Sequence, residues 1–123
     1  AEELDGKVFD REYDLKGNLL MPSFKNAHTH SAMTFLRSSA DDMPLQDWLF
    51  KQIFPMEAKL DGEKVYWLTK LAILEYLTTG CTAAFDMYFE LDDYVKACIE
   101  SGFRSVLCGA VRNLILKGLK TTI

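Results

Sequence analysis

The sequence contains few of the residues that mark a secreted or membrane protein. Of its 123 residues only three are cysteine, an odd number, and three are proline. The cysteines have no C-x-x-C spacing, so they predict free thiols in a reducing compartment such as the cytoplasm and exclude a disulfide framework. No apolar run approaches the roughly 18 to 20 residues that a membrane span needs, and the N-terminus lacks a basic-then-apolar leader. We therefore expect a cytoplasmic protein with no membrane partner.

Positive charge is also scarce. Lys plus Arg number 14 against 18 Asp plus Glu, which gives a formal net charge of −4. This balance disfavours contact with a phosphate backbone, so no nucleic-acid partner is expected. Hydrophobic residues are plentiful at 49%, with 26% charged, which is typical of a folded domain. The length predicts one domain or a piece of a larger one.

Turn-forming residues divide the chain into alternating strands and helices. The predicted elements are, in order, two short strands (7–14 and 19–22) around a turn at Gly17, an extended segment (23–30), a helix (45–53), a long helix (63–79), a strand (81–89), a shorter helix (92–101) and a strand (103–111). This alternation indicates βαβ units and a parallel α/β sheet. The three long strands cannot close by themselves, because a barrel needs eight strands and about 250 residues.

Two of these elements carry strong local signals. Asp61 and Gly80 are typical of the first and last residues around a helix, so they bound the long helix over 63–79. The strand over 81–89 is so rich in apolar and aromatic residues that we expect it to be buried on both faces. An open doubly wound sheet would need a glycine-rich phosphate loop, and the sequence has none.

The most informative motif is Asn26-Ala27-His28-Thr29-His30, which contains both histidines of the chain. Side chains alternate along a strand, so His28 and His30 are expected on one face. Two adjacent imidazoles can share one metal ion at about 2.0–2.1 Å each. The alternative is a surface turn that holds two histidines by chance. Placement at the carboxyl end of a buried strand favours the metal, because barrel sites lie there.

Two histidines do not complete a catalytic metal site, which usually takes three protein ligands. Asp86 lies near the end of the next strand and could reach the same place. We favour a structural role for Asp86, as an acceptor for backbone N–H groups, or a role in orienting a ligand histidine. The missing ligands must then come from elsewhere.

Several short segments stand in a specific order around this motif. They are MPSFKNAHTHS (21–31), MTFLR (33–37), ADD (40–42), Leu45, WL (48–49), PME (55–57) and FDMYF (85–89). This ordered set resembles the N-terminal part of the amidohydrolase superfamily. Within it, the set resembles the branch of 5′-methylthioadenosine/S-adenosylhomocysteine deaminases, with the related guanine deaminases and triazine chlorohydrolases.

The resemblance implies a fold and a set of site residues. It implies a (β/α)₈ barrel of the TIM type that carries a small β-sandwich. Residues 1–22 would end the sandwich, and residues 23–123 would form about the first three βα units of the barrel. His28 and His30 would be the first two ligands of a single divalent metal ion, usually zinc or iron. Glu57 matches a glutamate that binds ribose hydroxyls, and Trp48 matches an aromatic residue near the substrate.

Other interpretations of these residues remain open. Glu57 could be a solvated charge beside Lys59, and Trp48 a core residue. Arg37 and the pair Asp41-Asp42 also match the family, and we expect ion pairing there that fixes the loop after the first long strand. Cys108-Gly109 stands where some members carry an arginine, and residues 112–123 match no pattern.

The resemblance also implies an activity. A metal-activated water would replace the 6-amino group of an adenosine-type nucleoside, giving the inosine analogue and ammonia. The remaining ligands and the general base lie on later strands of the family, so no catalytic proton-transfer residue is expected within this chain, which alone would be inactive. Its unpaired strand edges predict an oligomer or the rest of a barrel as partner. The alternatives are a relative acting on guanine or a halogenated triazine, and a non-catalytic assembly module.

Overall fold

The computed structural model describes residues 6–109. Its strands are β1 (Phe24–Thr29), β2 (Cys81–Tyr88) and β3 (Arg104–Gly109). Its helical elements are the 3₁₀ segment η2 (Ser31–Leu36), α1 (Leu45–Asp47), the π-helical segment η3 (Trp48–Ile53), α2 (Phe54–Glu57), α3 (Gly62–Thr78) and α4 (Leu91–Ser101). Within the described residues, no helix is long and apolar enough to cross a membrane.

The three strands form one parallel sheet in the order β1-β2-β3, as the βαβ pattern predicts. The pairing of β2 with β3 is regular, whereas the pairing of β1 with β2 is interrupted twice, between Phe24 and Lys25 and again between Asn26 and Thr29. Asn26 pairs with Ala84 and Thr29 with Asp86, so β1 carries one extra residue between these two pairs. An extra residue of this kind is a β-bulge, which bends a strand and redirects its side chains. The bulge lies within the histidine motif and includes His28.

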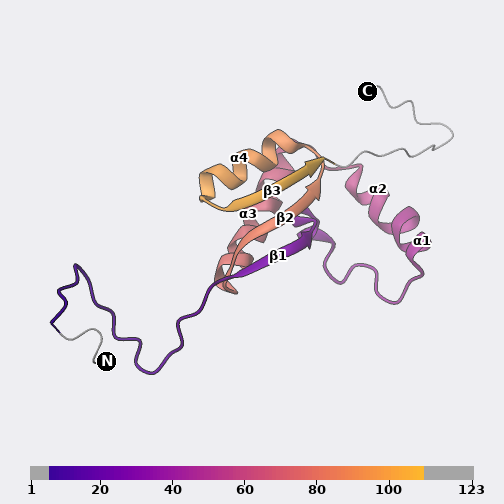
Figure 1. The fold of residues 1–123 in the computed structure, drawn as a ribbon. Coiled ribbons are helices and arrows are strands. Elements are labelled where there is room, and N and C mark those ends of the chain that lie inside the picture. Colours follow the sequence, from indigo (N-terminus) through magenta and orange to yellow (C-terminus); the bar gives the residue numbers. More distant parts are fainter. Residues whose placement is uncertain (1–5, 110–123) are drawn as a thin grey trace.

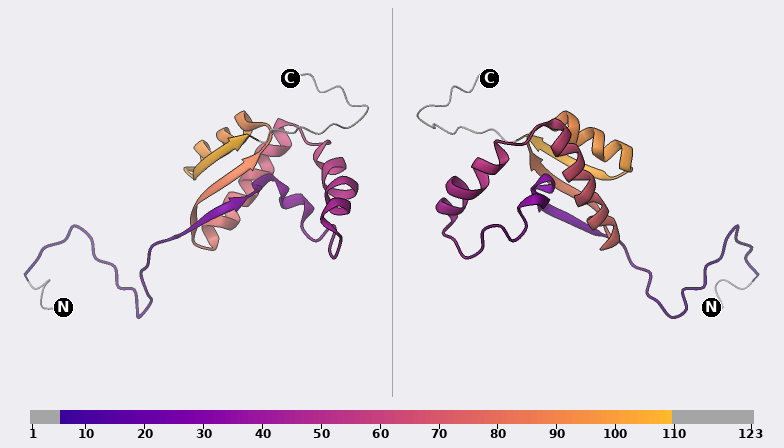
Figure 2. Two further views of the ribbon diagram at one scale, coloured as in Figure 1. Left: turned by 45° about the vertical axis from the view of Figure 1, so that its right-hand side comes forward. Right: turned by 180° about the vertical axis from the view of Figure 1, so that it is seen from behind.

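Helices α3 and α4 both lie on one face of the sheet (Figures 1 and 2). Helix α3 begins one residue before its predicted start, with Asp61 as the predicted N-cap, whose side chain accepts a hydrogen bond from the Lys64 backbone N–H. It ends before Gly80, whose φ of 81° suits a residue without a side chain. The core between helices and sheet consists of Ala32, Val65, Ile73, Ala84, Tyr88, Tyr94, Cys98 and Phe103.

The expectation that β2 is buried on both faces is wrong. Its even-numbered residues Ala84, Asp86 and Tyr88 are at most 4% exposed. In contrast, Phe85 is 46% exposed and Met87 is 39% exposed. Side chains alternate across a strand, and α3 and α4 cover only one face. The apolar composition of β2 is therefore typical of a strand covered on both faces, but within residues 6–109 only one face is covered.

The expectation of two strands at 7–14 and 19–22 is also wrong. The structure assigns no strand within residues 6–23, and residues 6–22 are exposed. Only the turn persists, where the Asn18 backbone N–H donates to the Leu15 carbonyl at 2.9 Å and Gly17 has φ of 84°. A strand needs a hydrogen-bonding neighbour, and the described residues offer these segments none. The assignment of residues 1–22 to a β-sandwich stays a prediction, and residues 1–5 and 110–123 lie outside the described residues.

The predicted helix over 45–53 is present but longer. Helical backbone continues from α1 through η3 to the end of α2 at Glu57, past Pro55. Proline is tolerated there because it lies in the first turn of α2, directly after the wider turns of η3. This helical stretch lies beyond the carboxyl ends of the strands (Figure 1).

Candidate active site

The two histidines come together at the carboxyl end of β1. Their ring centroids are 5.0 Å apart, with the planes at 82° to each other. His28 is in the strand and exposed, whereas His30 follows the strand and is half-buried. The prediction that both rings project to one side is therefore confirmed.

A hydrogen bond fixes the orientation of the His30 ring. Its Nδ1 lies 2.8 Å from the carbonyl oxygen of Met87, at the end of β2. A carbonyl only accepts, so Nδ1 carries a proton and donates; in the neutral imidazole, Nε2 is then the nitrogen with the lone pair. Ligand histidines in proteins are typically held in this way through the nitrogen that does not bind the metal.

The two imidazoles fit a metal ion as part of its ligand set. Neutral imidazole nitrogen is a preferred zinc ligand, and the rings are close enough for one ion to lie between them. Among residues 6–109, however, no group of three or more His, Cys, Asp or Glu side chains could hold a metal ion. The described residues therefore supply two ligands and not a complete site.

A cavity of about 310 Å³ lies beside His30. Its wall includes Trp48 of η3 and Glu57 of α2, together with the apolar residues Met33 and Phe54. The structure thus brings three of the four sequence-predicted site residues to one cavity. The fourth, His28, is not part of the wall but lies against His30.

The surroundings of Glu57 and Trp48 decide between the earlier interpretations. Glu57 is only 8% exposed, so the interpretation as a solvated charge beside Lys59 is wrong. Trp48 is half-buried and lines the cavity, so it is not an enclosed core residue. Glu57 is part of the cavity wall, and an ionised carboxylate only accepts hydrogen bonds. This arrangement suits a ligand that carries hydroxyl groups.

Asp86 has the structural role that the sequence favoured. It is 1% exposed, and its two carboxylate oxygens accept the Ser31 backbone N–H at 3.1 and 3.3 Å. Nearby, burial raises the pKa of the Tyr94 hydroxyl and of the Cys98 thiol. Both groups therefore stay protonated near neutral pH, and Cys98 is not a nucleophile.

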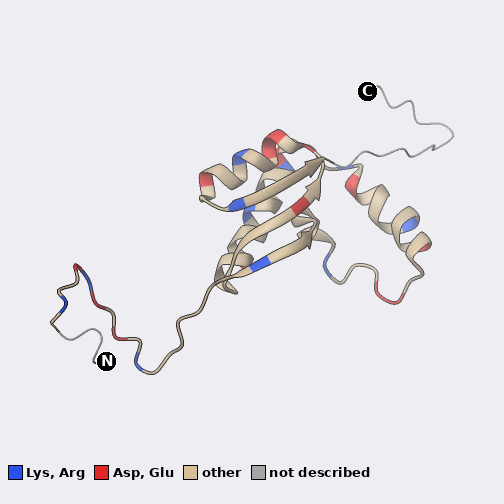
Figure 3. Cartoon of the chain, in the orientation of Figure 1, with Lys and Arg blue, Asp and Glu red and all other residues tan. Residues whose placement is uncertain are grey.

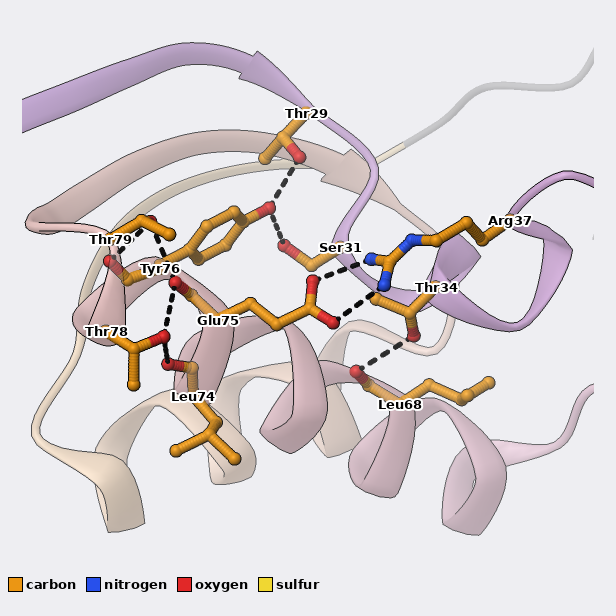
Figure 4. A network of polar contacts seen from close by, with 10 residues as sticks. All are labelled: Thr29, Ser31, Thr34, Arg37, Leu68, Leu74, Glu75, Tyr76, Thr78 and Thr79. Atoms are coloured by element: carbon orange, nitrogen blue, oxygen red, sulfur yellow. Dashed lines mark hydrogen bonds and ion pairs between the residues drawn. The ribbon is translucent and has the colours of Figure 1, made fainter.

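Helix α3 contributes a polar network that reaches Thr29 and Ser31, the two residues that flank His30 in the sequence (Figure 4). The Tyr76 hydroxyl lies 2.6 Å from Thr29 Oγ1 and 2.9 Å from Ser31 Oγ. Beside it, Arg37 donates two hydrogen bonds to the Glu75 carboxylate, at 2.7 and 3.0 Å. These bonds hold the pKa of Glu75 below its usual value.

The network corrects one expectation and adds one residue. Arg37 does fix the loop after β1, but its partner is Glu75 of α3 and not Asp41 or Asp42. The sequence patterns do not single out Tyr76 as a site residue. The available signal for Tyr76 was its position near the end of a helix that precedes a strand. That position does not indicate which residues the hydroxyl contacts.

The chain is similar to several known proteins. The model of a family described as the amidohydrolase family matches residues 19–116. The chain belongs to the amidohydrolase family. Amidohydrolase relatives include a 5-methylthioadenosine/S-adenosylhomocysteine deaminase from Syntrophomonas wolfei, 50% identical over 80% of this chain and 23% of that protein. A 5′-deoxyadenosine deaminase from Methanospirillum hungatei is 55% identical over 76% of this chain and 21% of that protein.

A solved amidohydrolase structure is also similar. It is an adenosine deaminase from Xanthomonas campestris with bound zinc, 44% identical to this chain, with a TM-score of 0.68. The match covers 70% of this chain and 20% of that protein. The three parallel strands and the helices on one face thus correspond to part of a TIM-barrel-type α/β fold. The chain spans between a fifth and a quarter of the relatives that it matches.

Proposed function

We propose that this chain is the N-terminal part of a metal-dependent hydrolytic deaminase that removes the 6-amino group of an adenosine-type nucleoside. The carrying observation is that His30, Trp48 and Glu57 line one cavity at the carboxyl ends of the strands, with His28 against His30. In barrels, active sites lie at this end. The relatives named as deaminases of adenosine-type compounds support the same reaction class.

In this proposal His28 and His30 hold one divalent ion, zinc or iron. When bound, such an ion lowers the pKa of a water molecule and so supplies the nucleophile at neutral pH. The hydrogen bond from His30 Nδ1 to Met87 keeps Nε2 available as the ligand atom. The other ligands and the proton-transfer groups come from later strands of the complete protein, outside these 123 residues, so the 123 residues alone are inactive.

The substrate contacts of the proposal are Glu57 and Trp48. Glu57 accepts hydrogen bonds from ribose hydroxyls, since it lines the cavity and an ionised carboxylate is a strong acceptor. Trp48 provides a large apolar surface beside the nucleoside. The cavity volume of about 310 Å³ is at the lower end of the range for small-molecule sites. In this proposal, later parts of the complete protein enlarge and complete the site.

The proposal also covers the domain boundaries, the partners of the strand edges and the cellular compartment. Residues 1–22 end a small β-sandwich, residues 23–123 begin the barrel, and the remaining barrel or further copies cover the open strand edges. All three cysteines are free thiols, which supports a reducing compartment, the cytoplasm.

The test uses the complete protein that contains this chain. We expect ammonia release from 5′-methylthioadenosine, S-adenosylhomocysteine or 5′-deoxyadenosine, and none from guanine. His30→Ala should lose the metal and lower kcat/KM at least about a thousandfold, because the nucleophile is no longer generated. Lys25→Gln, on the same strand but outside the cavity, serves as the control. Full activity of metal-free His30→Ala, or no turnover of any adenosine-type nucleoside, contradicts the proposal.

The role of Glu57 has a separate test. Glu57→Gln should raise the KM of an adenosine-type substrate about tenfold, since a charged hydrogen bond is replaced by a neutral one. The increase should be smaller for the matching 2′,3′-dideoxy nucleoside, which has no vicinal hydroxyls. Glu63→Gln on the exposed side of α3 is the matched control. An equal increase for both nucleosides would exclude the ribose contact.

A further inference from the structure

We infer that Tyr76 is a positioning residue for His30: its hydroxyl clamps the residues on both sides of the histidine and so sets the direction of the Nε2 lone pair. The inference rests on the proposed function, in which His30 is a metal ligand. The clamp consists of the Tyr76 contacts with Thr29 Oγ1 at 2.6 Å and Ser31 Oγ at 2.9 Å (Figure 4).

The position of His30 in the chain makes this clamp effective. Thr29 is the last residue of β1, and Ser31 is the first residue of the 3₁₀ segment η2. His30 lies between them with φ of −133° and ψ of 77°, so no regular element fixes its own backbone. Holding the side chains before and after it fixes the two peptide units that flank it. The direction of the His30 Cα–Cβ bond follows from those two units.

Two further contacts act on the same residue. The Ser31 backbone N–H donates to buried Asp86, which anchors the C-terminal side of His30 to β2. The ring Nδ1 is held by the Met87 carbonyl, also on β2. The Tyr76 clamp is the contact that comes from the helix layer instead of the sheet. It therefore fixes the distance between His30 and α3. The contacts with β2 do not set that distance.

Tyr76 is itself well supported. Its ring stacks on Phe103, with centroids 5.5 Å apart and planes at 22°. The adjacent residue, Glu75, is paired with Arg37 from the other end of η2. A phenol has one proton, so its oxygen donates to one of the two hydroxyls and accepts from the other. Tyr76→Phe therefore removes both contacts together and keeps the ring stacking.

The experiment measures metal affinity in the complete protein. The zinc dissociation constant of the Tyr76→Phe variant is determined by competition with a chromophoric chelator, and the melting temperature of the metal-free protein is recorded. We expect the zinc affinity to fall about tenfold, the lower end of the range for partners that orient a metal ligand. His30→Ala, measured in parallel, shows the effect of losing the ligand itself.

The matched control is Tyr66→Phe. Tyr66 lies on α3 like Tyr76, but its hydroxyl donates to the Glu100 carboxylate of α4, and Tyr66 is not part of the cavity wall. Loss of that hydroxyl should lower the melting temperature of the metal-free protein slightly but leave the zinc affinity within about twofold of the wild type. Equal zinc affinities of Tyr76→Phe and Tyr66→Phe would overturn the positioning role.

Further variants keep the inference falsifiable and separate it from the proposed function. If Tyr76→Phe does not fold, Thr29→Val and Ser31→Ala each remove one contact from the other side. Each should then weaken zinc binding severalfold, and unchanged affinity in both overturns the inference. If the variant folds, adding either change to it should have little further effect, since the shared contact is already lost. If the wild type binds no zinc, or His30→Ala binds it equally well, the proposed function is wrong as well.

Discussion

The two faces of the three-stranded sheet differ in what covers them. On one face, α3 and α4 bury Ala84, Asp86 and Tyr88 of β2 (Figure 2). On the other face, Phe85 and Val106 are 46% and 60% exposed. These two residues pair with each other in the register of β2 and β3, so they form one continuous apolar surface. One face thus packs against the helices and forms the core, whereas the apolar side chains on the other face are exposed in the described residues.

Charged residues are also distributed unevenly between the sheet and the rest of the chain. Most charged residues lie on the helices and the N-terminal segment, while each strand carries one (Figure 3). Parallel sheets in proteins are normally covered on both faces. In the proposed function, later strands of a complete barrel cover the open face and supply the missing ligands next to the histidine pair. Under that proposal the open face completes the site, and the covered face stabilises the chain.

A matched pair of substitutions tests this distinction most strongly. Val65 is fully buried on α3, and Val106 is 60% exposed on β3. In the complete protein we expect each valine-to-alanine change to lower the free energy of unfolding by about 2 kcal/mol, because each removes buried methyl groups and leaves a cavity. In the isolated 123 residues only Val65→Ala should do so. Urea denaturation of both variants in the complete protein and in the isolated chain, each measured against its own wild type, gives the comparison.

The informative outcome is Val106→Ala in the complete protein. A neutral effect there would mean that the open face stays exposed in the whole molecule. The chain would then not be the beginning of a closed barrel.

The second prediction concerns association of the isolated chain. Its open face and two strand edges should cause it to self-associate, since exposed apolar surface and unpaired strands bind further copies. Phe85→Lys should weaken this association at least tenfold, because a charge would be buried at the contact. Trp67→Lys, on an exposed position of α3, is the control for a lost apolar side chain outside the sheet. Sedimentation velocity at several concentrations measures both, and a monomer with sharp melting at all concentrations contradicts the prediction.

Local signals made most of the fold predictable. Asp61 and Gly80 act on the backbone within a few residues, so the bounds of α3 follow from the sequence alone. The two-residue period of a strand likewise placed His28 and His30 on one side. The shared cavity of His30, Trp48 and Glu57 follows from the family resemblance and not from any local pattern.

The errors arose where a partner distant in sequence decides the outcome. Residues 7–14 have the composition of a strand, but no strand forms without a neighbour to pair with. The exposure of Phe85 depends on what packs over the sheet, which β2 itself does not encode. Arg37 and Glu75 are 38 residues apart, so nothing in the loop sequence points to that pair in preference to Asp41 or Asp42.

The smallest predicted effect concerns that ion pair on the covered side. Arg37 and Glu75 have side chains 63% and 39% exposed, and exposed pairs contribute little. Arg37→Gln should therefore lower the melting temperature of the complete protein by only about one to three degrees at neutral pH. Arg37 lowers the pKa of Glu75, so its stabilisation is present above the ordinary glutamate pKa and is lost as the pH falls through the lowered value.

The difference in melting temperature between wild type and Arg37→Gln should consequently shrink below about pH 4 and in high salt. Lys51→Gln breaks the Lys51–Asp47 pair, which lies within one helical stretch, and serves as the control. Because Glu75 adjoins Tyr76, Arg37→Gln should also weaken zinc binding slightly, whereas Lys51→Gln should not. A difference in melting temperature that persists unchanged at pH 3 would show that Arg37 stabilises the loop through packing of its side chain and not through its charge.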